Sequence, residues 1–329
     1  MKKTSSLVIA LFIATTFFSS FKCIAQENLT KTLSEFELAV NYLESNDNFI
    51  NTISPALIIA NEIKDNLNND KYLVLDIRSE SWFEYGHIKN AENVKSSELL
   101  NYFENEITPS NYDKITIVCY SGQSAGYYAS LLRLAGYNNV FNLKWGMSSW
   151  ADEFATNIWL KNSKNTYTDK LETIANEMPE IGKTPILNTG KTKAKEIVNA
   201  RIKEIIAKPY KEFYVKADTV FNNPDNFYIV KYVNEEKYNY GHIKGAVRYQ
   251  PKGSLSSTAN LYTLPTDKKV LVSGMTGLST AYIVAYLNVL GYDVANLAYG
   301  ANSFMNEKLV KKSWDGFSKK ETKNYPVVE

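Results

Sequence analysis

A repeat at a fixed spacing limits what this chain can fold into. The pentapeptide Tyr-Gly-His-Ile-Lys occupies positions 85–89 and recurs at 240–244, and the two copies hold both histidines of the chain. The offset of 155 positions continues without a gap to Tyr137 and Tyr292. Such agreement indicates an internal duplication, and 329 residues are enough for two domains of common size. Other pairs matched by this offset are Ala91 with Ala246, Gly122 with Gly277, Ser124 with Ser279, Leu132 with Leu287, and Gly136 with Gly291.

Each copy carries the same order of expected elements. A short apolar strand precedes the Gly-His-Ile turn, and a second strand follows it and leads, through a loop with a glycine, into a segment of helical spacing. In the first copy this helix is expected at Gln123–Leu134, before the stop residue Gly136. Strands that alternate with helices predict a parallel sheet covered by helices, an α/β fold, in each copy. The expected strands are Tyr72–Leu75, Ile115–Val118, Phe227–Val230 and Val270–Ser273.

The first 25 residues differ from the rest of the chain. Two lysines precede an apolar run over 7–18, and the small residue Ala25 ends the segment. A charged start, a short apolar stretch and a small residue predict a cleaved secretory signal that is too short to span a membrane. We therefore expect an exported, periplasmic protein that begins at Gln26. A lipoprotein anchored at Cys23 is the alternative, but the Phe and Lys before this cysteine do not fit the small residues that such a signal needs.

The remaining chain is expected to divide into four parts. The sequence predicts a helical N-terminal segment over 26–54, a first domain over 55–158, a linker and helix over 159–207, and a second domain over 208–329. Without the first 25 residues, which hold three lysines and no acid, 34 basic side chains (37 − 3) and 35 acidic ones remain, a net charge of −1. This near-neutral balance, without a long basic run, gives no support for a nucleic-acid partner.

Cys119 is the residue best placed for chemistry. It ends an apolar strand and begins a loop directly before a helix, where backbone amides and the positive helix end converge on one sulfur. A thiolate is stabilised there and becomes a usable nucleophile that can carry a persulfide. With Cys23 removed it is the only thiol, so no intramolecular disulfide is expected; a buried structural cysteine is the alternative reading. The loop continues with Tyr120, Ser121, Gly122, Gln123 and Ser124.

Four landmarks in a fixed order resemble the rhodanese family. They are Leu-Asp-Ile-Arg at 75–78, Gly-His-Ile at 86–88, the six-residue loop 119–124, and Leu-Lys-Trp-Gly-Met-Ser-Ser-Trp at 143–150. The resemblance covers residues 55–155 and implies a sulfurtransferase that moves sulfane sulfur through a persulfide on Cys119. A small sulfur donor or a persulfide-carrying protein would be its partner. Many family members place an arginine at the sixth loop position to hold an anionic donor, and Ser124 in its place argues against thiosulfate.

Other residues near these landmarks take expected roles by the same resemblance. Asp76 is expected to be structural and Arg78 to lie at the rim of the pocket, although an exposed pair worth little is the alternative. His87 is interpreted as a turn residue, because its twin His242 stands in a copy without a nucleophile. Trp145 replaces the usual first glycine of its motif, and it is expected either to form a bulky wall near the loop or to pack in the core.

The second copy, over about 210–315, is expected to be catalytically silent. Gly274 stands at the position of Cys119, and Lys231 and Val233 replace the pair of charges. No acid or further histidine is available to activate a serine of its loop. Gly274 is also expected at a backbone angle that a side chain disfavours. The second domain is therefore expected to dock on the first and to form a wall of its cleft.

Three classes of function remain open. A sulfur-moving enzyme leads, and a non-catalytic binding module that holds a partner through the paired fold is second. A phosphatase or arsenate reductase on a related fold is third, but it needs a longer loop that ends in arginine to surround a tetrahedral oxyanion. The sequence has no metal-ligand spacing, phosphate loop or dinucleotide fingerprint, so no metal or other cofactor is expected.

Overall fold

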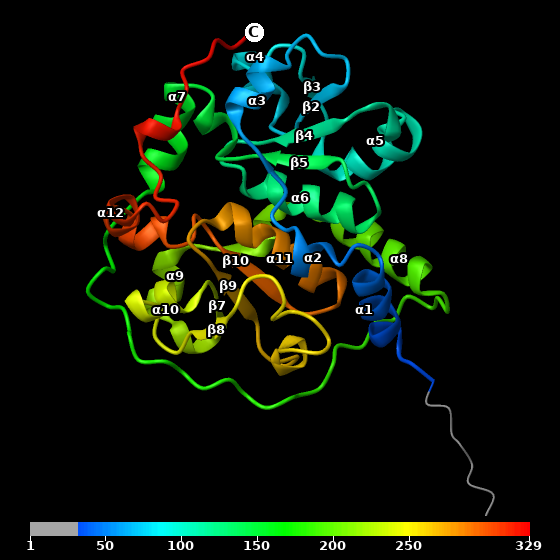
Figure 1. The fold of residues 1–329 in the computed structure, drawn as a ribbon, viewed down its shortest axis with the longest axis vertical. Coiled ribbons are helices and arrows are strands. Elements are labelled where there is room, and N and C mark those ends of the chain that lie inside the picture. Colours follow the sequence, from blue (N-terminus) through cyan, green and yellow to red (C-terminus); the bar gives the residue numbers. More distant parts are fainter. Residues whose placement is uncertain (1–31) are drawn as a thin grey trace, which may run out of the picture. The chain divides into compact units, whose positions relative to one another are not determined.

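The computed structural model describes residues 32–329, of which 33–329 form one compact unit. The expectations for the signal segment, its cleavage site and Cys23 lie outside the described residues. Two sheets of five parallel strands make up the framework of the compact unit (Figure 1).

The two sheets have the same strand order. The first is arranged β1-β5-β4-β2-β3 and the second β6-β10-β9-β7-β8, and every pairing is parallel. Each strand therefore has a counterpart at the same place in the other sheet, which confirms the tandem α/β fold. The first sheet consists of β1 (Leu57–Ile58), β2 (Tyr72–Asp76), β3 (Glu92–Asn93), β4 (Lys114–Val118) and β5 (Val140–Leu143). The second consists of β6 (Tyr214–Val215), β7 (Tyr228–Tyr232), β8 (Val247–Tyr249), β9 (Val270–Ser273) and β10 (Val294–Leu297).

The strand registers follow the sequence repeat. Asp76 lies opposite Val118, and Lys231 lies opposite Ser273, so the central strands keep the offset of 155 positions. In the last strand of each sheet the offset is 154, because Val140 and Val294 take the same place. The second copy is thus one residue shorter than the first in the turn before β10, beyond the region that the repeat covers.

Helices flank both sheets. None of those in the described part of the chain is long and apolar enough to cross a membrane. The twelve α-helices described are α1 (Glu35–Ser45), α2 (Phe49–Thr52), α3 (Ala60–Asp65), α4 (Glu80–Tyr85), α5 (Leu99–Asn105), α6 (Gln123–Leu134), α7 (Asp152–Ala155), α8 (Ala194–Ile206), α9 (Ala217–Asn222), α10 (Glu235–Tyr240), α11 (Gly277–Val289) and α12 (Asn302–Lys312).

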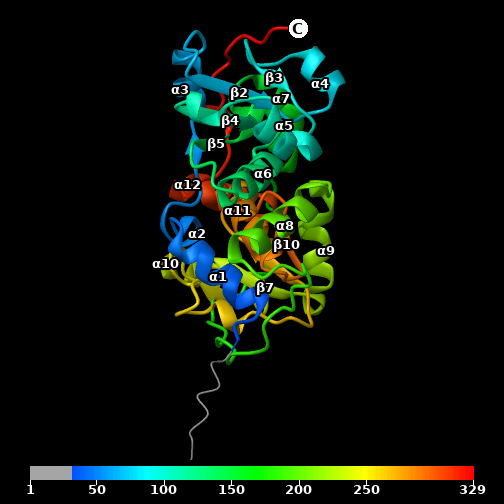
Figure 2. The same ribbon diagram turned by 90° about the vertical axis from the view of Figure 1, so that its right-hand side faces the viewer.

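Helices α6 and α11 pack against each other between the two sheets (Figures 1 and 2). Eleven of the twelve residues of α6 and twelve of the thirteen in α11 are buried, as is usual for helices enclosed on all sides. Gly126 lets the helices approach closely, because a Cβ at this position would lie 2.8 Å from the carbonyl oxygen of Leu278. The Ser130 hydroxyl donates to the carbonyl oxygen of Tyr282 at 3.0 Å. The equivalent helices α6 and α11 thus form the core of the interface between the copies.

The N-terminal helix α1 packs on α8 beside this interface. It begins with a capping box, in which the Ser34 hydroxyl accepts from the Glu37 backbone and the Glu37 carboxylate accepts from the Ser34 backbone. Phe36 and Val40 of α1 are fully buried in the same core as Ile197 of α8. Helix α8, expected over 192–207, therefore serves as a packed element and not as a free spacer.

Two extended segments cross between the halves in a reciprocal way. The C-terminal strap, residues 318–329, leaves the second half and reaches the first, where Val328 forms an antiparallel bridge with His87 (Figure 1). The linker strap, residues 165–176, leaves the first half and reaches the second, where Glu172 forms an antiparallel bridge with His242. Each Gly-His-Ile turn is therefore covered by the segment that follows the other copy.

Candidate functional site

The loop 119–124 connects the carboxyl end of β4 to the first turn of α6, as expected from the sequence. Cys119 is 2% exposed, and its Sγ accepts hydrogen bonds from the backbone N–H groups of Gly122 at 3.1 Å and Ala125 at 3.4 Å. Gly122 has a φ of +81°, and a Cβ there would lie 3.0 Å from the Leu143 carbonyl oxygen, so this position requires glycine. Two amide hydrogens at the start of a helix favour negative charge on the sulfur.

A tight turn after β5 supports the loop from behind. The Met147 N–H donates to the Cys119 carbonyl oxygen at 2.9 Å, and the Ser148 hydroxyl donates to the Tyr120 carbonyl oxygen at 3.2 Å. Gly146 has a φ of +59°, and a Cβ on it would overlap the Cys119 carbonyl oxygen. The Trp-Gly-Met-Ser motif is thus explained by its close approach to the loop.

Trp145 packs in the core and does not line the pocket beside the loop. It is 2% exposed, and its ring meets Trp159 edge-on at 4.7 Å and Phe317 at 5.3 Å between centroids. Its Nε1–H donates to the Glu321 carboxylate at 3.1 Å. Of the two roles expected for Trp145, the geometry therefore favours packing.

The prediction that Arg78 lies at the pocket rim was wrong. Arg78 is 3% exposed, and its guanidinium folds back onto Asp76, with Nη2 and Oδ2 2.7 Å apart. Nη2 also donates to the Gly86 carbonyl oxygen at 2.7 Å, and the guanidinium lies 5.0 Å from the centre of the Phe154 ring. The pair is a buried brace between β2 and the Gly-His-Ile turn, and the exposed-pair alternative is wrong as well.

His87 and His242 make the same contacts in the two copies. His87 Nδ1 donates to the Phe83 carbonyl oxygen at 2.9 Å, and His242 Nδ1 donates to the Tyr238 carbonyl oxygen at 2.9 Å. Each ring stacks on the aromatic ring four residues earlier. Because the copy without a nucleophile keeps these contacts, they agree with a structural role in the turn.

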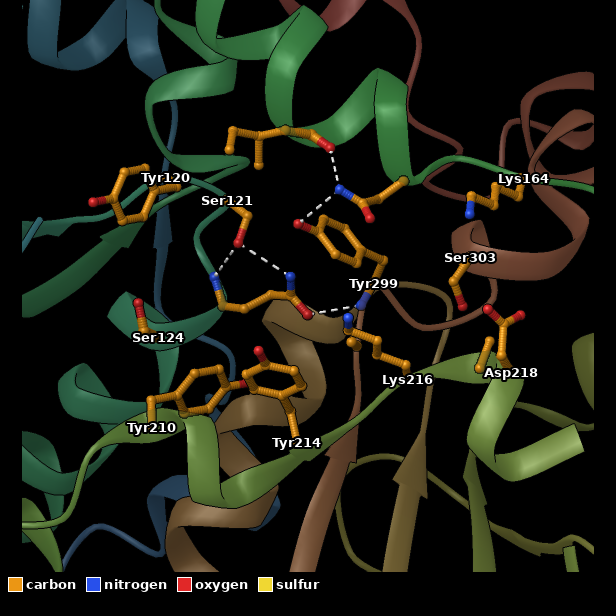
Figure 3. A pocket seen from close by; sticks show the side chains of 15 residues that line it. Tyr120, Ser121, Ser124, Lys164, Tyr210, Tyr214, Lys216, Asp218, Tyr299 and Ser303 are labelled. Carbon is orange, nitrogen blue, oxygen red and sulfur yellow. Dashed lines mark hydrogen bonds between the residues drawn. The ribbon is translucent and has the colours of Figure 1, made fainter. Parts of the chain in front are cut away.

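A pocket of about 430 Å³ opens beside the loop (Figure 3). Tyr120, Ser121 and Ser124 line one side of it, whereas Lys216 and Asp218 line the other and belong to the second half. The second half thus forms a wall next to the loop that carries Cys119. The remaining lining residues are Gln123, Ile158, Asn162, Lys164, Tyr210, Tyr214, Ala217, Ala298, Tyr299 and Ser303.

The Gln123 side chain ties the loop to the second half. Its Oε1 accepts from the Tyr299 N–H at 2.7 Å, and its Nε2 donates to the Ser121 hydroxyl at 3.1 Å (Figure 3). Gln123 is buried, so these bonds are shielded from water. Gly277 is needed at this contact, because a Cβ there would overlap the Gln123 amide oxygen.

The counterpart of Cys119 has no room for a side chain. A Cβ on Gly274 would lie 2.7 Å from the Thr280 methyl carbon. The expectation of an unfavourable backbone angle was wrong, because Gly274 is not among the glycines with positive φ. A side chain at this position is therefore disfavoured by steric overlap and not by backbone conformation.

Sequence reasoning missed the pocket residues outside the loop. Tyr210, Tyr214 and Lys216 lie before or at the start of α9, and no local spacing marks them. Tyr299 precedes Gly300 as Trp145 precedes Gly146, and both aromatic residues have positive φ. An alignment of the two copies that allows for their one-residue difference in length could have pointed to Tyr299, but to none of the other three residues.

Known proteins resemble this chain in sequence. The family model for the rhodanese-like domain matches residues 59–153. The thiosulfate sulfurtransferase GlpE of Shewanella oneidensis is 32% identical over 78 residues, which cover 23% of this chain and 73% of that protein. The uncharacterised protein YqhL of Bacillus subtilis is 24% identical over 147 residues, 45% of this chain and 93% of the relative.

Two longer proteins match in part. This chain spans 22% of the adenylyltransferase and sulfurtransferase UBA4 of Candida albicans, at 29% identity over 98 residues and 28% of this chain. The solved structure of a thiosulfate sulfurtransferase from Pseudomonas aeruginosa is 15% identical in sequence, with a TM-score of 0.31. The match covers 90% of this chain and 48% of the chain of that structure. On the match to GlpE and the family model, this chain belongs to the rhodanese-like family.

Proposed function

We propose that the protein is a sulfurtransferase that carries sulfane sulfur as a persulfide on Cys119. The observation that supports this most is the sulfur's place: Sγ accepts two backbone N–H groups at the start of α6, in a loop whose neighbouring residues line a pocket. The amides that hold the thiolate would equally hold the anionic outer sulfur of a persulfide. The sulfurtransferase names among the relatives are consistent with this chemistry.

The reaction needs no cofactor or oxidant. The Cys119 thiolate attacks the outer sulfur of a donor R–S–SH, the donor S–S bond breaks, and R–S⁻ leaves. Cys119 now carries –S–SH, and the proton passes to the more basic of the two sulfur anions. An acceptor nucleophile then attacks the outer sulfur and returns Cys119 to the thiolate. No electrons are gained or lost overall, because one S–S bond is exchanged for another.

Mass spectrometry of the intact protein tests the proposal. Incubation with a persulfide donor should add about 32 Da, one sulfur atom, and reductant or cyanide should remove it. Cys119→Ser should gain nothing. Thiosulfate should be a poorer donor than an organic persulfide, because Ser124 stands where the resemblance to the rhodanese family implies an arginine in many members. If wild type and Cys119→Ser behave alike with every donor, a non-catalytic binding module becomes the better reading.

We also propose that the protein is exported and cleaved after Ala25, on the strength of the charged and apolar start of the sequence. N-terminal sequencing of the protein isolated from its native cells should begin at Gln26. A mature terminus at an acylated Cys23 would instead place the protein on a membrane surface.

A further inference from the structure

The charges of the pocket are unbalanced. Its lining holds two lysines, Lys164 and Lys216, and one carboxylate, Asp218, so its net charge is +1 (2 − 1). Asp218 accepts a hydrogen bond from the Tyr167 hydroxyl at 2.9 Å. Neither lysine forms an ion pair with any carboxylate of the described residues, although Lys144 and Lys269 elsewhere do. Two ammonium groups are therefore available to a ligand.

Two tyrosine hydroxyls of the pocket have hydrogen atoms without an acceptor among the described residues. The Tyr210 hydroxyl accepts from the Asn296 amide at 2.8 Å, and the Tyr299 hydroxyl accepts from the Asn162 amide at 3.2 Å. Each phenol thus has its proton left to donate. Burial raises the pKa of both hydroxyls, and an electrostatic contribution from the neighbouring Cys119 adds to the rise for Tyr299, so both stay protonated at neutral pH. A ligand with oxygen acceptors would satisfy them.

The size and position of the pocket suggest more than thiosulfate. A volume of about 430 Å³ is more than thiosulfate, with five non-hydrogen atoms, would fill. Tyr120 and Ser121, which follow Cys119 in the chain, line one side of the pocket, and Lys164 lies on the opposite side, with Lys216 between them in Figure 3. In that view the Lys216 side chain extends from the second half toward Tyr299. A ligand that spans the pocket can place sulfur at the loop and a negative group at the lysines.

We propose that Lys216 and Lys164 bind the negatively charged group of an organic persulfide whose sulfur reacts with Cys119. The catalytically silent half would then supply the cation that Ser124 does not, and this would be its contribution to the reaction. The inference rests on the proposed function, because it assigns the donor of the same site. The negative group is part of R and forms and breaks no bond in the S–S exchange, so the lysines bind the donor and R–S⁻ departs with that group still attached.

A pair of donors that differ only in charge tests the assignment. The rate of Cys119 persulfide formation is measured with 3-mercaptopropionate persulfide and with its methyl ester, and kcat/KM for the acid is divided by that for the ester. Wild type should prefer the acid. Lys216→Gln and Lys164→Gln should each lower the ratio about two- to fivefold, the range for exposed charge pairs. Lys216→Arg should retain most of the preference, and a tenfold rise in ionic strength should reduce it.

Two controls keep the outcomes distinct. Lys268→Gln removes an exposed lysine that precedes β9 and does not line the pocket, so this variant should leave the ratio unchanged. The ester rate should stay constant in every lysine variant, which shows that the fold and Cys119 are intact. If wild type is loaded by neither donor, the proposed function fails. If wild type is loaded by both donors without preference, or if Lys216→Gln keeps the wild-type ratio, the anion site is refuted and the sulfurtransferase stands.

Discussion

Asp76 of β2 and Lys231 of β7 occupy the same place in the two sheets, and both are fully buried. The Asp76 carboxylate is neutralised by Arg78, whereas the arginine position in the second copy is Val233. Lys231 Nζ has no hydrogen-bond partner among the described residues. Burial lowers the pKa of Lys231 to about 7, and the positive charge of Lys237 adds to the effect. The second copy therefore has no thiol at the position of Cys119, but its core contains the unpaired amine of Lys231.

Removal of Asp76 should be far more damaging than removal of an exposed acid. Asp76→Ala leaves the Arg78 guanidinium buried without its counter-charge, and the expected loss of unfolding free energy is about 3–5 kcal/mol. Asp293→Ala is the matched control, because Asp293 pairs with Lys269 at 2.6 Å on the surface, and it should cost less than about 1 kcal/mol. Urea denaturation midpoints measure both. Equal losses in the two variants would mean that the buried pair adds nothing special.

Lys231→Met should stabilise the protein, and most of all below pH 7. An unfolded lysine keeps its proton up to its ordinary pKa of 10.5, but folded Lys231 releases it near pH 7. Between these values the unfolded state binds more protons, so wild-type stability from this group rises with pH by about 1.4 kcal/mol per unit and is lowest below pH 7. The gain from Lys231→Met should therefore be a few kcal/mol at pH 6 and shrink toward pH 10. Urea midpoints at several pH values measure it, with the exposed Lys268→Met as control. A gain that does not depend on pH would contradict the lowered pKa.

At the scale of elements, the sequence predicted what depends on local signals. Helix α6 has the predicted bounds, because Gly122 and Gly136 mark both of its ends, and β9 also matches. Strands β2 and β4 are each one residue longer than predicted. Arg78 was misplaced because the Asp-x-Arg spacing does not reveal that the guanidinium turns back toward Gly86.

The pocket could not be predicted from the sequence for a different reason. Lys216 and Tyr299 reach the Cys119 loop only because α6 and α11 bring the copies together. The repeat predicts that two domains exist, but it carries no information about which of their faces meet. Four of the pocket residues, Tyr120, Ser121, Gln123 and Ser124, were found from sequence because they are neighbours of Cys119 in the chain.

The contact between α6 and α11 should not tolerate a methyl group at Gly126. Alanine is a better helix former than glycine by about 1 kcal/mol, yet its Cβ would lie 2.8 Å from the Leu278 carbonyl oxygen. Overlap with a rigid backbone should win, and Gly126→Ala should lower stability by about 1–3 kcal/mol. Gly182→Ala is the control, since its Cβ would have no neighbour closer than 3.9 Å. Thermal or urea denaturation measures whether Gly126→Ala raises or lowers the free energy of unfolding. A more stable variant would show that the two helices can separate at little cost.

At the scale of the whole molecule, the two straps make each copy depend on the other. Val327 of the C-terminal strap packs on Gly86, and a Cβ on that glycine would meet its methyl group at 3.0 Å. Leu171 of the linker strap packs in the same way on Gly241, also at 3.0 Å. Equivalent turns are therefore covered by equivalent segments of the opposite copy. This packing gives both Gly-His-Ile turns a structural role that does not depend on Cys119.

The C-terminal strap should protect the first half, including the support of the Cys119 loop. The Thr322 hydroxyl donates to the Ser148 carbonyl oxygen at 3.0 Å, and Ser148 in turn holds the loop. Truncation after Ser318 removes this bond and the bridge to His87. Amides of β2 and β4 should then exchange hydrogen faster than those of β7 and β9, and sulfur uptake by Cys119 should slow.

Two point variants give the same test without shortening the chain. Val327→Asp places a charge against the first half and should loosen β2 and β4, whereas Leu171→Asp should loosen β7 and β9. Hydrogen exchange read by mass spectrometry distinguishes the halves, because each variant acts on the copy that its strap reaches and not on the copy that it leaves. The opposite pattern would arise if each strap served its own half. If both variants loosened all four strands equally, the halves would unfold as one unit, and the straps would have no local role.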